Sequence, residues 1–246
     1  MDLSIRRNPP GLVHALALAM TALVISSALG ATAYAGVVTT DSVLRAAKAT
    51  IAKQSGVHVV FKASSSSSSI NEKIVADVGT TGGVETVFVG KADLTVKVTP
   101  TYGYVSGNSS GLTTIFGLSS ADAKKVGTDW VSWKAGTSQY GNLKSSLTIS
   151  SVTGLLPKAK GTRLSIDVTN GAKLYVLKWT SAATSSTPKL SNMLTVSAGA
   201  TTLPVEETAT DSGGTKVTTT LSKWGEHVLV KAPPVAATIT SSKITG

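Results

Sequence analysis

Short stretches in which apolar and polar residues alternate, separated by glycine-containing turns, make up most of this chain. In residues 57–63 every second side chain, from Val57 to Ala63, is apolar. A period of two is typical of a β-strand with one buried face. Later stretches of this kind are joined by Asn170-Gly171 and by residues 211–214, which are typical hairpin turns. The strands are therefore expected to follow one another in an antiparallel sheet.

About eleven strands are expected in this sheet. They run from residue 57 to residue 106, return at 129–134, and continue from residue 162 to a last candidate at 227–232. An antiparallel sheet needs one apolar face covered, and a sheet with this many strands tends to curl. Helices can then cover the concave face.

Two parts of the chain have helical patterns instead. Residues 41–55 place Val43, Leu44, Ala47 and Ile51 on one helical face, and the following glycine can end that helix. A second block, residues 112–156, contains several short helical stretches. We therefore expect an α+β fold, a single strongly curved antiparallel half-barrel with helices over its concave face. The pattern leaves open whether a cavity or a packed core lies between sheet and helices.

The N-terminal segment has the order of an export signal. Arg6 and Arg7 precede an apolar stretch, residues 11–33, and the small-x-small sequence Ala33-Tyr34-Ala35 follows. This layout predicts a signal peptide at 1–35, with an uncleaved membrane anchor as the alternative. We expect one domain at 36–234, a flexible tail at 235–246, and an exported protein in the cell envelope or secreted.

The composition limits the partners of the chain. Its formal net charge is +10, but the lysines are scattered and no nucleic-acid-binding motif is present. The excess charge is either a solvated surface or one that attracts anionic headgroups and acidic polymers. There is no cysteine, so the domain depends on core burial without disulfides.

No sequence motif points to catalysis or to a metal. A Gly-x-Ser-x-Gly elbow is absent, and His58 and His227 have no second ligand at metal-binding spacing. The sparse carboxylates form no evident acid–base pair. We therefore expect a protein that is not an enzyme and needs no cofactor or metal.

The C-terminal third carries a resemblance to a known family. The segments 193–196, 203–206 and 216–221, followed by SKWGEHVLVKAPP at 222–234, resemble the end of the actinobacterial envelope lipoproteins of the LppX/LprG group, whose fold is LolA-like. The helix at 42–54 and the Gly127–Val131 segment match the same group. The resemblance implies a half-barrel whose apolar cavity holds the acyl chains of envelope lipids or glycolipids, and a carrier role.

One departure from that family is clear. Its members have an acylated cysteine at the first mature position, where this chain has Gly36. Lipid anchoring through cysteine is therefore excluded, and contact with the membrane surface by a monomer is the expectation. The alternative is a non-catalytic envelope module with a solid interior that binds acidic polymers or a protein. The side chains predicted to line the cavity are Leu44, Ile51, Phe61, Leu112, Ile115, Phe116, Leu143, Leu147 and Leu155.

Overall fold

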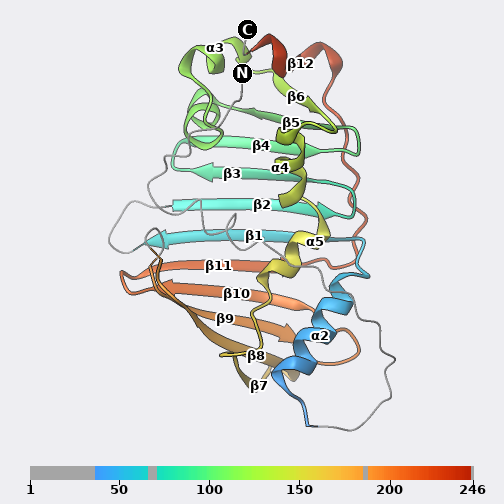
Figure 1. Ribbon diagram of the computed structural model, residues 1–246, viewed down its shortest axis with the longest axis vertical. Coiled ribbons are helices and arrows are strands. Elements are labelled where there is room, and N and C mark those ends of the chain that lie inside the picture. Colours follow the sequence, from blue (N-terminus) through green and yellow to red (C-terminus); the bar gives the residue numbers. More distant parts are fainter. Residues whose placement is uncertain (1–36, 66–70, 185–187, 245–246) are drawn as a thin grey trace.

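A single sheet crossed by helices on one face forms the body of the molecule (Figure 1). The computed structural model describes residues 37–65, 71–184 and 188–244. The predicted signal peptide at 1–35 lies outside the described residues.

The sheet contains twelve strands among the described residues, one more than the approximate number expected from the sequence. Their order across the sheet is β12-β6-β5-β4-β3-β2-β1-β11-β10-β9-β8-β7, and only the β12–β6 pair is parallel. The strands are β1 (Gly56–Ser65), β2 (Asn71–Gly79), β3 (Gly83–Val89), β4 (Ala92–Val98), β5 (Tyr102–Gly107), β6 (Trp130–Lys134), β7 (Arg163–Thr169), β8 (Ala172–Ser181), β9 (Leu190–Ser197), β10 (Pro204–Asp211), β11 (Thr215–Ser222) and β12 (Thr238–Thr240).

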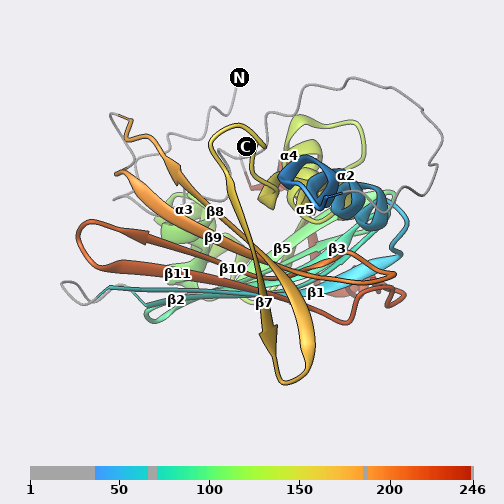
Figure 2. The same ribbon diagram turned by 90° about the horizontal axis from the view of Figure 1, so that it is seen from below.

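The sheet is open, with β12 and β7 at its two edges. Seen from below it twists strongly, so that β7 lies steeply across the direction of β1 and β2 (Figure 2). The pairing of β1 with β11 joins the strands of the first half of the chain to those of the second half. The predicted α+β class, with a curved antiparallel sheet and helices on one face, is confirmed.

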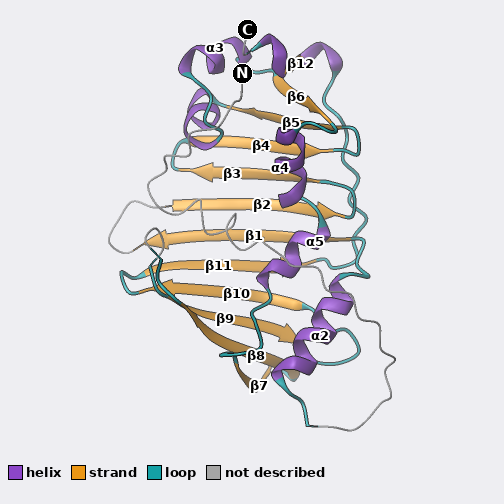
Figure 3. Cartoon of the chain, in the orientation of Figure 1, coloured by secondary structure: helices purple, strands orange, loops and turns teal. Residues whose placement is uncertain are grey.

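Helices α2, α4 and α5 lie over one face of the sheet (Figure 2), and Figure 3 shows them in purple against the orange strands. In Figure 1, α2, α4 and α5 cross the right-hand part of the strands, and α3 lies at the opposite side near the top. The helical elements are α2 (Thr40–Ile51), η1 (Gly111–Ile115), α3 (Ser120–Val126), α4 (Ser138–Ser146), α5 (Ile149–Val152), η2 (Thr153–Leu155), η3 (Val235–Ala237) and η4 (Ser241–Lys243). The helical blocks predicted at 41–55 and 112–156 are both present.

Helix α2 begins at a capping box. The Ser42 backbone N–H donates to Thr39 Oγ1 at 3.2 Å, and the Thr39 N–H donates to Ser42 Oγ at 2.9 Å. These two bonds satisfy backbone donors that the first turn of a helix leaves free. The helix buries Val43, Ala47 and Ile51, as the apolar spacing predicted, but it ends before residue 55.

The strand register assigns each side chain to a face of the sheet. Val59 pairs with Ala76, Ala76 with Glu85, and Glu85 with Val96, so these four side chains point to the same side. We call this side the inner face, because it carries the buried core. The main apolar cluster joins inner-face strand residues to Leu112, Leu143 and Leu147 of the helical side. The inner face is therefore the helix-covered, concave face.

The chain end corrects one prediction. Strand β12 pairs in parallel with β6, with Ile239 opposite Val131, and Ile244 is 2% exposed. Lys125 Nζ donates to the Ile244 carbonyl at 3.0 Å. The expectation of a flexible tail from residue 235 is therefore wrong for residues 235–244, because they complete the β6 edge of the sheet.

A second correction concerns residues 227–232, which form no strand. Strand β1 is already hydrogen-bonded to β2 on one side and to β11 on the other. Residues 227–232 therefore cannot pair with β1 as a further strand. Val228 packs against two glycines instead: a methyl group at Gly56 would lie 2.7 Å from Val228 Cγ2, and one at Gly79 would lie 3.0 Å from its Cβ.

Candidate ligand-binding face

Helix α4 covers the inner face at strands β4 to β6. The Tyr140 hydroxyl donates to the carbonyl oxygens of Thr99 and Pro100, at 3.0 Å each, and this ties the helix to the end of β4. Leu143 reaches so close to β5 that a methyl group at Gly103 would lie 2.9 Å from its Cδ1. The glycine therefore permits the close approach of α4 to the sheet.

The π-helical turn η1 covers the other end of β3, β4 and β5. The Gly111 N–H donates to Asn108 Oδ1 at 2.7 Å, and Asn108 Nδ2 donates to Asp93 Oδ2 at 2.9 Å. A methyl group at Gly111 would overlap the carbonyl group of Asp93. This close contact places Leu112, which is 0% exposed, against the strands.

Between sheet and helices, several apolar side chains keep accessible surface. On the sheet side they include Val59, Ile74 and Val89, which are only partly buried although they lie on the inner face. Phe116 and Trp133 are also partly buried, and their rings pack at a tilt of 53° with centroids 5.3 Å apart. Apolar groups therefore face accessible space from both layers.

The predicted lining residues lie in different surroundings in the structure. Ile51, Leu112 and Leu147 are 0% exposed and belong to the solid part of the main cluster. Leu44 packs instead against a second cluster under α2, while Phe61, 4% exposed, belongs to neither cluster. The remaining residues of the prediction lie in or against the main cluster: Ile115, Phe116, Leu143 and Leu155. Their role in lining a ligand cavity stays a prediction.

Three carboxyl groups on the inner face are the feature that sequence reasoning missed. Glu85 lies between Ala76 and Val96, Glu207 between Thr219 and Leu194, and Glu72 between Ala63 and Val89. The alternation contained a signal for Glu85, because it stands two residues before Val87 and four before Val89, on their face.

Burial changes the ionisation of these groups. It raises the pKa of Glu207 to about 7, and burial together with the nearby Glu72 carboxylate raises the pKa of Glu85 to about 7. Burial also raises the pKa of Glu72. A carboxyl group that loses its water without gaining a cation or hydrogen-bond donors favours its neutral form.

None of the three carboxyl groups forms a hydrogen bond or an ion pair within the described ranges. Nevertheless, no side-chain oxygen or nitrogen in those ranges is both sealed from solvent and without a partner. The carboxyl oxygens of Glu72, Glu85 and Glu207 therefore reach accessible space. Water can therefore touch these oxygens, although they lie on the face that carries the buried core.

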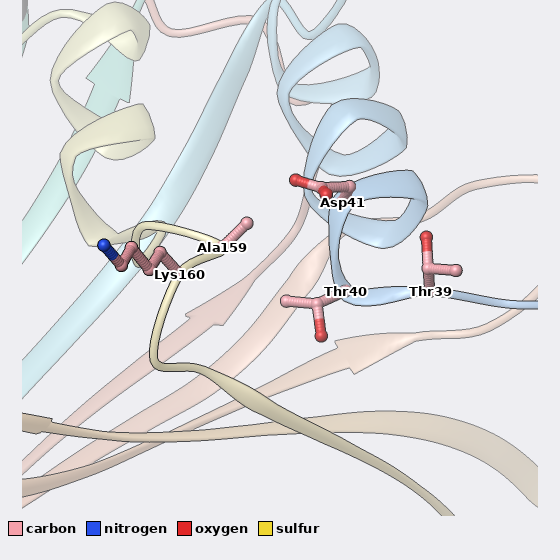
Figure 4. Close-up of a pocket in the computed structure, with 5 residues that line it drawn as sticks. All are labelled: Thr39, Thr40, Asp41, Ala159 and Lys160. Atoms are coloured by element: carbon pink, nitrogen blue, oxygen red, sulfur yellow. The ribbon is translucent and has the colours of Figure 1, made fainter.

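A separate surface depression lies at the start of α2 (Figure 4). Its volume is about 570 Å³ and its lining consists of Thr39, Thr40, Asp41, Ala159 and Lys160. The lining is mostly polar, and none of the predicted acyl-chain contacts belongs to it. This depression therefore does not correspond to the predicted cavity.

The outer face carries the basic residues of the central strands. Lys62 lies directly opposite Lys73, and both are exposed. A close ion pair there joins His58 Nδ1 to Asp77 Oδ1 at 2.6 Å, across β1 and β2. Within the described part of the chain, no group of histidine and acidic side chains is arranged to hold a metal ion.

An open, curved antiparallel sheet with helices over an apolar concave face defines the half-barrel class to which this fold belongs. Among solved structures, LprF from Mycobacterium bovis is similar, with a TM-score of 0.50, 16% sequence identity, and coverage of 79% of this chain and 96% of LprF. The Mycobacterium tuberculosis lipoprotein LppX is another structural neighbour, with a TM-score of 0.49, 15% identity, and coverage of 78% and 98%.

A DUF1329 family protein from Desulfovibrio piger is more distant, with a TM-score of 0.33, 9% identity, and coverage of 78% and 93%. No protein-family model and no curated protein matches the sequence. The likeness to LprF concerns the fold alone, and it agrees with the family resemblance in the sequence. No helix of the described ranges is long and apolar enough to cross a membrane.

Proposed function

We propose that this protein is a non-enzymatic carrier of acylated lipids or glycolipids in the cell envelope. It holds acyl chains between the inner face of the sheet and the helical cover. The observation that carries this proposal is the accessible apolar surface on both layers, at Val59, Ile74 and Val89 of the sheet and at Ile115 and Phe116 of the cover. The fold shared with LprF supports it.

The energetics of such a carrier are simple. Each methylene removed from water contributes about 0.8 kcal/mol, so two sixteen-carbon chains contribute on the order of 25 kcal/mol. A membrane offers a similar gain. A carrier therefore needs only to match the bilayer, and no nucleotide or metal is required for exchange.

In this proposal, the half-buried and the fully buried residues of the helical cover have different roles. The half-buried Ile115, Phe116 and Leu155 touch the acyl chains, whereas Ile51 and Leu147 support the core behind them. Because the chain contains no cysteine, it acts without a cysteine-linked lipid anchor, as an exported envelope or secreted protein.

Lipid extraction tests the proposal. The purified protein is examined by native mass spectrometry, then incubated with vesicles and extracted again. We expect bound acyl species, and a Phe116→Ser variant should retain several-fold less. The matched control is Phe88→Ser, because Phe88 is 41% exposed and lies on the outer face. A folded protein that contains no lipid and takes up none would refute the carrier function.

A second candidate function is suggested by the outer face. Lys62 and Lys73 are cross-strand neighbours of like charge, an arrangement that costs stability when no anion is near. An envelope module that binds an acidic polymer would use this surface. Salt-sensitive polymer binding that a Lys62→Gln, Lys73→Gln variant loses, without any lipid uptake, would favour this candidate.

A further inference from the structure

In strands β1 to β6 and β9 to β11, the described residues of the inner face include carboxyl groups but no lysine or arginine, whereas the outer face carries lysines together with Asp77, Asp93 and Glu206. Every lysine of these strands points outward by the strand register, and no arginine occurs there. These lysines are Lys62, Lys73, Lys97, Lys134 and Lys216.

The inner face of the same strands carries carboxyl groups instead. Glu72, Glu85 and Glu207 stand there among apolar neighbours, whereas the carboxylate of Asp211 is engaged in its own turn, where it accepts from the Thr215 N–H at 2.8 Å. Among the described residues of these strands, the charge-bearing inner-face groups without a hydrogen-bond or ion-pair partner are therefore all acidic.

Two lysines of the helical cover contact other groups of the protein. Lys125 Nζ donates to Asp122 Oδ1 at 3.3 Å and to the Ile244 carbonyl. Lys144 Nζ lies 5.8 Å from the centroid of the Tyr140 ring. Neither lysine offers its charge to a ligand on the inner face.

The residues directly opposite the carboxyl groups on the neighbouring strands include buried apolar side chains, and Thr219 beside Glu207 is also buried. Ala76 and Val96, on either side of Glu85, are 5% exposed each. Leu194 beside Glu207 is 0% exposed. Glu72 as a whole residue is only 5% exposed, and it has no hydrogen-bond or ion-pair partner among the described residues. An unpartnered polar group at such depth costs free energy unless a ligand or water supplies hydrogen bonds.

Glu85 and Glu207 are too far apart for a shared metal site or an acid–base pair. Glu85 on β3 and Glu207 on β10 are separated by strands β2, β1 and β11. At about 4.8 Å per strand step, this separation is roughly 19 Å. They are therefore separate contact points on one apolar surface.

We propose that Glu85, Glu207 and Glu72 are the polar contacts for the carried lipid, and that they select an uncharged, hydroxyl-bearing lipid over an anionic phospholipid. This inference rests on the proposed carrier function. A hydroxyl group donates to an ionised carboxylate and both donates to and accepts from a protonated one, so it is bound in either state. A phosphate group would meet only groups that repel it or that must first be protonated.

Competitive loading tests the selection. The purified protein is incubated with vesicles of equal amounts of monogalactosyl diacylglycerol, phosphatidylglycerol and a trimethylammonium diacyl lipid, all with the same acyl chains. Bound lipid is extracted and quantified by mass spectrometry. We expect the galactolipid to exceed phosphatidylglycerol at least tenfold.

Two double variants separate the effect of charge from that of hydrogen bonding. Glu85→Gln with Glu207→Gln keeps hydrogen-bonding groups and removes the charge, so phosphatidylglycerol uptake should rise about tenfold with galactolipid uptake retained. Glu85→Leu with Glu207→Leu should lower galactolipid uptake severalfold. The control Glu206→Gln, on the outer face beside Glu207, should change neither. Circular dichroism checks the fold of each variant.

The outcomes are distinguishable. Uptake of all three lipids in equal amounts, preference for the cationic lipid, or an unchanged preference in the double glutamine variant overturns the selection but leaves the carrier function standing. Absence of any lipid uptake by the wild-type protein overturns the carrier function, and this inference with it.

Discussion

The Glu85→Gln substitution should stabilise the protein at alkaline pH and do so much less at pH 5. Glu85 lies on the inner face between Ala76 and Val96, without a hydrogen bond or ion pair in the described ranges. Its pKa is raised from 4.5 to about 7. Glutamine has nearly the same shape but never ionises, so the variant isolates the cost of the buried charge.

The direction of this pH dependence of stability follows from proton binding. Between pH 4.5 and 7 the folded protein holds a proton on Glu85 that the unfolded chain has released, so stability falls as pH rises through this window. Below the unfolded-state pKa both states are protonated and the penalty disappears. Each pKa unit corresponds to about 1.4 kcal/mol, so the full shift sets an upper limit of about 3 kcal/mol. Because Glu85 retains some solvent contact, we expect about 1–2 kcal/mol at pH 8.5.

Urea unfolding at pH 5 and pH 8.5, followed by circular dichroism, measures this difference. The wild-type protein should lose stability between the two pH values, and Glu85→Gln should lose less. Glu206→Gln is the matched control, because its side chain lies on the outer face and should leave the pH dependence as in the wild type. If Glu85→Gln has the same pH dependence as the wild type, the carboxyl group is not buried as we argue.

Four further substitutions test the packing, each by urea unfolding. Gly141→Ala in α4 meets no atom within 4 Å and should stabilise by about 1 kcal/mol; destabilisation would contradict the helix assignment. Gly111→Ala should destabilise by more than about 1 kcal/mol, because its methyl group overlaps the Asp93 carbonyl. Leu147→Ala removes a 0%-exposed side chain and should cost about 2–5 kcal/mol. Thr39→Ala removes the capping oxygen of α2 and should cost about 1 kcal/mol, whereas Thr39→Ser should cost little.

The local elements could be predicted from sequence because their signals are local. Alternation defines a strand over a few residues, and Asn170-Gly171 forms its turn with both residues at positive φ, 51° and 78°. The apolar spacing that predicted the helix at 41–55 is the face that α2 buries. The curl of the sheet and the side on which the helices lie followed from the number of strands and the need to cover an apolar face.

The same local signals gave wrong strand predictions where the pairing with another strand decides whether a strand forms. Residues 227–232 alternate like a strand but have no partner, and residues 238–240 became a strand because the β6 edge was free. Alternation shows that a segment can pair, but a strand forms only where another strand offers unpaired backbone groups.

The sequence by itself determined that hairpins would build one curved sheet with a helical cover, since periodicity and turns act between neighbours in the chain. Only the tertiary structure decided that β1 pairs with β11, and through that pairing that Glu207 shares an apolar interior with Glu72 and Glu85. The physical reason is that strand register is set between segments far apart in the chain. A carboxyl group loses its water, and its ordinary pKa, only when that register turns it inward.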